Sequence, residues 1–267
     1  MDFLTNFSSV ILENILLLVP VVAIFTRLSI FIYLLPGIGE TVIPQRIRLG
    51  IAFLMTWILV PLILPGTSLP NMTLPTGFLL IVKEGFYGFV LGLAFRLMVF
   101  TLQILGNIIS QALSISQVLG EGIATEPNTT ISTLLMMAGT TLLVTMDLHV
   151  EAIGIFYRSY EVFPIGTSPK LDNIAYWMTQ KAVGTISFAV TLALPFIILN
   201  FVYNLMLGFL NRAMPQLMVS FVGLPAITGA GLFLMVIATG SILVFWAQEY
   251  WTSFNGFQDL SSFGFPQ

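Results

Sequence analysis

The feature that most constrains this chain is a series of long apolar runs. A transmembrane helix needs about 20 mostly apolar residues, because the hydrocarbon core of a bilayer is about 30 Å thick and a helix rises 1.5 Å per residue. We expect six such helices, with the third continuing as a helix to about residue 117. The six runs are residues 10–35, 47–65, 78–104, 131–156, 182–210 and 217–246.

The composition supports a membrane protein without a soluble domain. Hydrophobic residues make up 57% of the chain and charged residues 8%, whereas soluble domains carry about 25% charged residues. A soluble fold of 267 residues leaves roughly a quarter of the surface of its unfolded chain in water, so it could not hide this much apolar surface. The sequence therefore predicts an all-α, multi-helix integral membrane protein.

Several functional classes are excluded by what the sequence lacks. The net charge is −3 and there is no basic run, which argues against a nucleic-acid partner. The chain has no cysteine and one histidine, so thiolate and two-histidine metal sites are excluded. There is also no G-x-S-x-G nucleophile elbow. We therefore predict no catalytic, metal-binding or cofactor-binding residues.

The chain ends and the loops give little information on targeting and membrane orientation. The N-terminal "MDFLTNFSSVILEN" has no basic n-region, and we expect it to lead uncleaved into the first segment. The Gly- and Ser-rich tail is expected to be poorly ordered. The positive-inside rule predicts no orientation, because the basic residues divide three against four between alternate loops. They are Arg46, Arg48 and Arg212 against Lys83, Arg158, Lys170 and Lys181.

Charged residues inside the apolar runs need partners, because a charge at the centre of a span costs about 2.5–3.5 kcal/mol on insertion scales. Glu84 and Arg96 are 12 residues apart, or roughly 18 Å along one helix, so they cannot pair with each other. Their partners must be other helices, other subunits or water. The intrasegment set is Arg27, Glu84, Arg96, Asp147, His149 and Glu151.

The segment "DLHVE" (147–151) is a weak candidate for a metal or proton site. Asp147 and Glu151 are four residues apart and share a helix face, whereas His149 points elsewhere. Three convergent ligands are not available from this helix alone. We therefore favour an ordinary wet end of a membrane segment.

Two helix faces in the third run carry small or polar residues. Gly85, Gly88 and Gly92 lie on one face and favour close helix packing. Further along, uncharged polar residues step by four, three, four and three, which forms a polar stripe that ends at the turn "GEG" (120–122). Such a stripe either hydrogen-bonds to neighbouring helices or faces a water-filled lumen, and both interpretations stay open. The stripe is Gln103, Asn107, Ser110, Ser114 and Gln117.

One motif resembles a known family. The stretch "NRAMPQLMVSFVGLP" (211–225) is similar to the signature R-x-x-P-Q-x-x-V-x-x-x-G-x-P of the FliR family of flagellar export-gate proteins, related to the T-type components of type III secretion. Stretches such as "PGIGETVIPQRIRLG" (36–50) and "KEGFYGFVLGLAFRL" (83–97) agree in order, so the resemblance covers nearly the whole chain. The matching positions, which the resemblance places at the bend of a helical hairpin, are Arg212, Pro215, Gln216, Val219, Gly223 and Pro225.

The resemblance implies a non-enzymatic role in the bacterial inner membrane, in the flagellar basal body. It implies a FliP-like part (about 1–180), a FliQ-like helical hairpin (about 181–250) and a flexible tail (251–267). The implied partners are FliP and FliQ in a hetero-oligomeric ring, FlhB around it, unfolded export substrates and membrane lipid.

The resemblance also implies a plug inside the pore, supplied by the segment after the long third helix. By position this is about residues 106–122. The usual aromatic residues near the glycine turn are replaced here by aliphatic ones, which suit a constriction that gates by dewetting. The candidate plug residues are Asn107, Ser110, Leu113, Ser114, Ile115, Gln117, Val118, Leu119, Gly120 and Gly122.

Three alternatives remain at this stage. The T-component of a virulence secretion system shares the motif. A small-solute secondary transporter would also have broken helices and buried charges, although the shared Pro-Gln of "IPQRIRLG" (43–50) and "MPQLMVSFVG" (214–223) is too little to establish a repeat. A membrane-embedded enzyme is the third, without a convergent catalytic set to support it.

Overall fold

The computed structural model describes most of the chain as helices joined by short connections. The described ranges are residues 2–40, 43–66, 73–113, 129–168, 171–213 and 219–255. Of residues 2–17, 74, 219–222 and 253–255, only the backbone is described.

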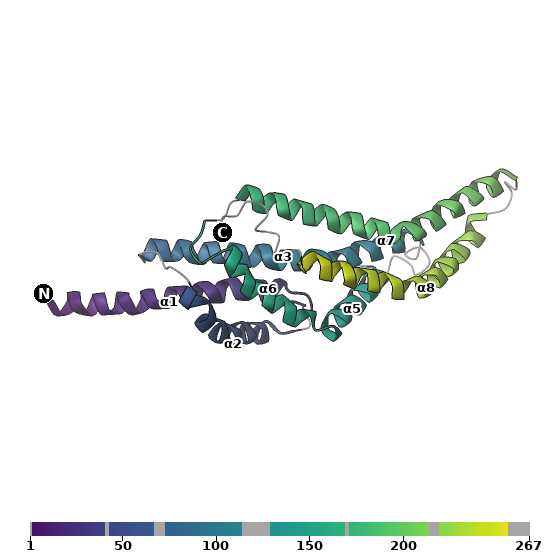
Figure 1. The fold of residues 1–267 in the computed structure, drawn as a ribbon. Helices are drawn as coiled ribbons and strands as arrows, with labels where there is room; N and C mark the ends of the chain where they lie inside the picture. The colour runs from purple at the N-terminus through teal and green to yellow at the C-terminus, as the bar shows by residue number, and fades with distance from the viewer. Residues whose placement is uncertain are drawn as a thin grey trace. The chain divides into compact units, whose positions relative to one another are not determined.

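All the regular elements in these ranges are helical (Figure 1). In chain order they are α1 (Asp2–Leu34), α2 (Gln45–Ile63), the 3-10 turn η1 (Leu64–Gly66), α3 (Leu74–Ala112), α5 (Thr130–Thr145), α6 (Leu148–Val162), α7 (Leu171–Ala213) and α8 (Val219–Asn255). The predicted all-α, multi-helix fold is confirmed. α8 continues to Asn255, into the stretch 251–267 for which a tail is expected, and the rest of that stretch lies outside the described residues.

Four helices are long and apolar enough to cross a membrane, by length and composition, among the residues that the structure describes. They are α2, α3, α7 and α8, which correspond to the second, third, fifth and sixth predicted spans. The described apolar part of α1, Leu18–Leu34, is shorter. α5 and α6 together make a fifth candidate if an interrupted helix counts as one span.

The prediction of one continuous helix over 131–156 is wrong. α5 ends at Thr145 and α6 begins at Leu148, with Asp147 between them in the left-handed region at φ 55. A left-handed residue cannot continue a right-handed helix, and this conformation is uncommon outside glycine and asparagine or aspartate. The sequence there has no glycine or proline, so nothing in the local pattern announces the break.

The chain divides into two compact units. Unit 1 comprises residues 1–96, 146–180 and 254–267. Its core contains an aromatic cluster in which Phe31 of α1 lies 5.5 Å from Phe95 of α3 and 5.2 Å from Phe156 of α6, between ring centroids. All three side chains are almost fully buried.

Glycines bring α1 and α3 close together within unit 1. A Cβ on Gly88 would lie 2.3 Å from the carbonyl oxygen of Arg27, and one on Gly92 would lie 2.7 Å from Cβ of Leu34. Gly85 faces Ile30 at a looser 3.2 Å. The predicted glycine face is therefore a packing surface for α1, as close approach between membrane helices requires.

Unit 2 comprises residues 97–145 and 181–253. Trp246 of α8 is 1% exposed and donates a hydrogen bond from Nε1 to the carbonyl oxygen of Met98 in α3, at 2.8 Å. α5 packs into the same region, because a Cβ on Gly139 would meet Leu102 and the Trp246 ring. These contacts join α3, α5 and α8 into one core.

Candidate functional site: the buried arginine cluster and the end of α3

Arg27 is a buried charged residue whose guanidinium makes four hydrogen bonds. Its Nη1 lies 3.3 Å from Oε2 of Glu84 and also donates to the carbonyl oxygen of Phe163 at 3.1 Å. Its Nη2 donates to the carbonyl oxygen and to Oγ of Ser159, at 3.1 and 2.9 Å. Neither the Arg27 nor the Glu84 side chain is exposed. The pair thus joins α1, α3 and α6 at one buried point.

Aromatic rings surround the guanidinium. The Arg27 Cζ lies 4.0 Å from the centroid of the Tyr160 ring, 5.2 Å from that of Tyr87 and 5.9 Å from that of Phe156. Rings at this distance attract a cation through their negative faces, most strongly where water is absent. Arginine suits such a site because its planar group can stack and donate in the plane at the same time.

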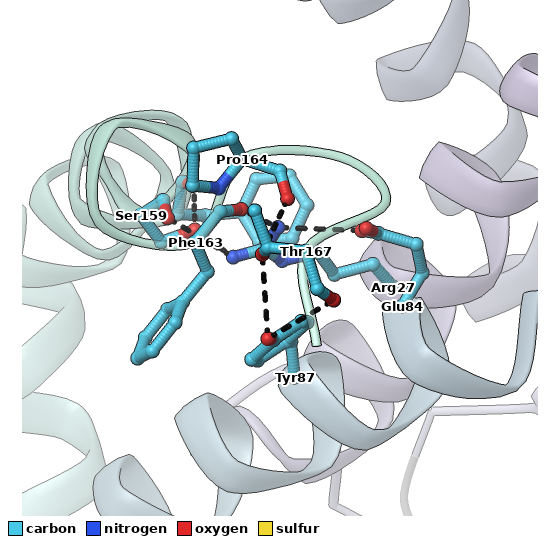
Figure 2. A network of polar contacts seen from close by, with 8 residues as sticks. Arg27, Glu84, Tyr87, Ser159, Phe163, Pro164 and Thr167 are labelled. Atoms are coloured by element: carbon cyan, nitrogen blue, oxygen red, sulfur yellow. Dashed lines mark hydrogen bonds and ion pairs between the residues drawn. The ribbon is translucent and has the colours of Figure 1, made fainter. Parts of the chain in front are cut away.

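The segment after α6 is held against α3 by this cluster (Figure 2). Tyr87 stacks on Phe163 with ring centroids 4.7 Å apart, and its hydroxyl lies 3.5 Å from two oxygens of Thr167. Lys83 donates to Oγ of Ser168 at 3.0 Å. The arrangement fixes residues 163–168, which lead toward α7.

A glycine turn shapes the same segment. Gly166 has φ 87, and the N–H of Thr167 donates to the carbonyl oxygen of Pro164 at 3.2 Å. A positive φ at the third turn position favours glycine. The sequence "FPIGTSP" (163–169) contains this turn signal, but the acceptors that meet Arg27 are main-chain carbonyls, and no residue pattern identifies those.

Two of the other intrasegment charged residues, Arg96 and Glu151, also have side-chain partners. Arg96 lies 2.9 Å from Glu40, which follows α1, and Glu151 lies 2.6 Å from Arg158 on the same helix, α6. Glu84 and Arg96 thus each pair with a residue outside their own helix. Asp147 precedes α6 without a side-chain cap hydrogen bond. No group of three His, Cys, Asp or Glu side chains in the described ranges could hold a metal ion.

Arg48 holds the connection between α1 and α2 through main-chain oxygens. Nε and Nη2 both donate to the carbonyl of Ile43, at 3.0 and 2.8 Å, Nη1 donates to that of Gly39 and Nη2 to that of Glu40. The Arg48 Cζ also lies 5.3 Å from the ring centroid of Tyr33. Arg48, one of the basic residues assigned to the loops from the sequence, therefore lies in the first turn of α2 and holds the connection that precedes it.

The first part of the predicted polar stripe is packed. Oδ1 of Asn107 accepts from the N–H and the hydroxyl of Thr129, at 3.4 and 3.2 Å. Ser110 is 3% exposed and Leu113 is fully buried. Asn107 therefore hydrogen-bonds to a neighbouring segment of unit 2, whereas the buried Ser110 hydroxyl has no hydrogen-bond partner among the described residues. The remaining plug candidates lie outside the described residues: Ser114, Ile115, Gln117, Val118, Leu119, Gly120 and Gly122.

Part of the hairpin-break motif is described. Arg212 is exposed in the last turn of α7, where a cation is favoured by the helix dipole. Gly223 of α8 meets α7, because a Cβ there would lie 2.3 Å from the hydroxyl oxygen of Tyr203. Pro225 lies inside α8 and is exposed. Pro215 and Gln216 lie outside the described residues.

Comparison with known proteins identifies the family. The profile described as "Bacterial export proteins, family 1" matches residues 18–252. The flagellar biosynthetic protein FliR of Caulobacter vibrioides is 32% identical over 228 residues, which cover 85% of this chain and 91% of the relative. The protein of the same name from Escherichia coli is 29% identical over 230 residues, 85% of this chain and 87% of the relative.

A more distant relative agrees. The flagellar biosynthetic protein FliR of Bacillus subtilis is 25% identical over 226 residues, which cover 83% of this chain and 86% of the relative. The matched region includes the arginine cluster, the end of α3 and the hairpin-break motif. The resemblance to FliR proteins is thereby confirmed, and the chain belongs to the family of bacterial export proteins, family 1.

Proposed function

We propose that the chain is a core component of the flagellar type III protein export gate in the bacterial inner membrane, with a structural and not an enzymatic role. One observation carries the proposal: the family match spans residues 18–252, and the similar proteins bear the name flagellar biosynthetic protein FliR. The apolar helices agree with a membrane location.

The gate would be a hetero-oligomer with FliP and FliQ, with FlhB bound to it. Residues 1–180 would act as the FliP-like part and 181–250 as the FliQ-like hairpin. The exposed faces of α7 and α8 support this assembly, since only 22% of the apolar stretch of each helix is buried within the chain. Asn204 is exposed among apolar residues of α7, and within the described part of the chain its amide donates back to Asn200 of the same helix. Its carbonyl oxygen would be unsatisfied in lipid, which favours a protein neighbour at this face.

Within the gate, residues 106–122 would contribute a plug that closes the pore between export events. Asn107, Ser110 and Leu113 would form its base, because they are packed in unit 2. Ile115, Val118 and Leu119 are the aliphatic residues that would close the pore by dewetting. Gly120 and Gly122 would let the chain turn. Ser114 and Gln117 would continue the polar stripe into the pore. The substrate that passes through the pore would be unfolded polypeptide.

A complementation experiment tests the function. A strain that lacks the gene should fail to swim and to release flagellar proteins into the medium, and the wild-type chain should restore both. FliP and FliQ should copurify with the affinity-tagged chain. Swimming and release at the parental level in the deletion strain would overturn the proposal.

The same strain separates the alternatives. Loss of host-directed secretion with unchanged swimming would assign the chain to a virulence secretion system. The flagellar names of the relatives favour the flagellum. A solute transporter would give a growth defect on its solute, with normal release of flagellar proteins.

A further inference from the structure

The last turn of α3 is held by α8 at one small site. Oγ1 of Thr228 donates to the carbonyl oxygen of Leu113 at 2.9 Å. Three residues later, a Cβ on Gly231 would lie 1.9 Å from Cδ2 and 2.7 Å from Cγ of Leu113. The Leu113 side chain, fully buried, therefore occupies the space that any other residue at position 231 would need.

The hydrogen bond departs from the habit of threonines in these helices. Threonine hydroxyls in apolar helices usually donate to the carbonyl four residues earlier, as Thr239 does to Met235 and Thr191 does to Ser187. A hydroxyl has one proton to donate, so Thr228 gives up that local bond. Its acceptor, at the end of α3, is one of the carbonyls that a helix leaves without an intrahelical partner. Thr228 thus caps α3 from another helix.

The contact surface on α8 is narrow at this point. Ile227 is 2% exposed and Gly231 is buried, whereas Leu232 is 46% and Phe233 is 70% exposed. Thr228 and Gly231, together with Ile227, lie on one face at helical spacing. The end of α3 therefore meets the face of α8 that carries Thr228 and Gly231.

A second contact that holds this region lies six residues earlier on α3, at Asn107. Asn107 binds Thr129 as described above, and a Cβ on Gly106 would lie 2.3 Å from Cα of Ser132. This contact ties the beginning of α5 to α3 without α8. The chain is thus held at residue 113 by α8 and at residue 129 by α3.

We propose that Thr228 and Gly231 are positioning residues, which form a socket through which the α7–α8 hairpin sets where the chain leaves α3. Among the described residues, the socket holds the end of α3 through α8. A shift of the hairpin therefore acts on residue 113 and leaves the Asn107–Thr129 contact in place. The effect on the pore rests on the proposed export function, whereas the socket itself does not.

Cysteine cross-linking tests the socket. The chain has no native cysteine, so the pair Leu113→Cys and Gly231→Cys reacts without a competing thiol from this chain. We expect oxidation of the intact gate in membranes to form an intramolecular disulfide, since the two positions are in contact. The control pair, Leu113→Cys with Gly240→Cys, moves the second thiol about 13 Å along α8 and should stay reduced. Equal yields from the two pairs would overturn the socket.

Substitutions test the positioning role. Thr228→Val keeps the volume and removes the hydrogen bond. It should slow formation of the Leu113–Gly231 cross-link by about two- to tenfold, which is the factor that corresponds to the free energy of one neutral hydrogen bond. It should also raise ion leakage through assembled gates. Thr228→Ser should restore both values, and Thr239→Val, which loses only a bond within its own helix, should change neither.

Gly231→Val is a second test of the positioning role. Gly240→Val is its control, because nothing lies within 4 Å of a Cβ at position 240. We expect leakage from the first variant and not from the second, at equal amounts of assembled gate. Thr228→Val and Gly231→Val gates as tight as their controls would overturn the positioning role. Failure of the export function would appear separately, as normal swimming of the deletion strain with the cross-link still formed.

Discussion

Oε2 of Glu84 lies 3.3 Å from Nη1 of Arg27, across 57 positions of sequence, and neither side chain is exposed to solvent. Each charge alone would be costly to bury, and each offsets the cost of the other only because the surrounding groups also bind. The carbonyls of Ser159 and Phe163 supply those further bonds. Because this one pair contacts α1, α3 and α6, the packing of each of these helices depends on the other two.

Removal of Arg27 should destabilise unit 1 strongly. Arg27→Ala leaves Glu84 buried without its cation, which costs about 3–5 kcal/mol. Thermal unfolding of the purified protein in detergent should show a large drop in Tm. Arg27→Met with Glu84→Met should be milder than Arg27→Met alone, since two apolar side chains leave no uncompensated charge. The exposed pair provides the control, because Arg158→Ala should cost at most about 1 kcal/mol.

Gly88→Ala should separate α1 from α3. The new Cβ would lie 2.3 Å from the carbonyl oxygen of Arg27, and main-chain atoms cannot move aside cheaply. We expect a loss of about 1–3 kcal/mol, as for other overpacked sites. Gly50→Ala is the matched control within unit 1, because its Cβ would meet nothing within 4 Å. That variant should be about 0.5–1 kcal/mol more stable, through helix propensity. Equal unfolding temperatures would contradict the close approach.

Trp246 should be the main tryptophan anchor of unit 2. Trp246→Phe loses the hydrogen bond to Met98 and should cost about 1 kcal/mol. Trp246→Ala also opens a cavity and should cost about 3–5 kcal/mol. Denaturant unfolding followed by fluorescence measures both. Trp251, 45% exposed on the same helix, is the control, and Trp251→Phe should stay within about 0.5 kcal/mol of wild type.

Deletion of residues 114–120 should make cells leak ions while export continues, if the plug assignment is right. The deletion spares Ser110 and Leu113, because their loss would disturb the packing of unit 2 as well. Ion conductance of the membrane and released flagellar protein are measured on the same cells. Unchanged conductance with the gate assembled would rule out the plug. An equal deletion in the C-terminal tail, 258–264, controls for chain shortening.

The fold class could be predicted because it follows from the apolar content and the run lengths. The Gly85–Gly92 face could also be predicted as a packing surface, since the spacing of the glycines determines which residues share a face. The break at Asp147 could not, because it depends on one left-handed residue in a stretch with neither glycine nor proline. Aspartate tolerates the left-handed region better than most residues, but its presence alone does not predict a break.

The candidate site was predictable in its residues and not in its pairings. The positions of Arg27 and Glu84 inside apolar runs mark them as charged residues that need partners. That they meet each other depends on how α1 packs on α3, and two of the remaining acceptors are main-chain carbonyls. The capping of Leu113 by Thr228 is hidden for the same reason. A threonine in an apolar helix normally satisfies itself, so nothing in its sequence context announces a distant acceptor.

Among the described residues, the hydrogen bonds of the Arg48 side chain all go to main-chain oxygens, those of Gly39, Glu40 and Ile43, and this has a consequence for evolution. Every residue type offers the same carbonyl, so substitutions at positions 40 and 43 leave the arginine contacts intact. Position 39 is the exception, because a Cβ there would lie 2.3 Å from the carbonyl oxygen of Tyr33. Relatives should therefore keep the arginine and the glycine, whereas position 43 can change without loss of these contacts and position 40 is constrained by its own ion pair with Arg96.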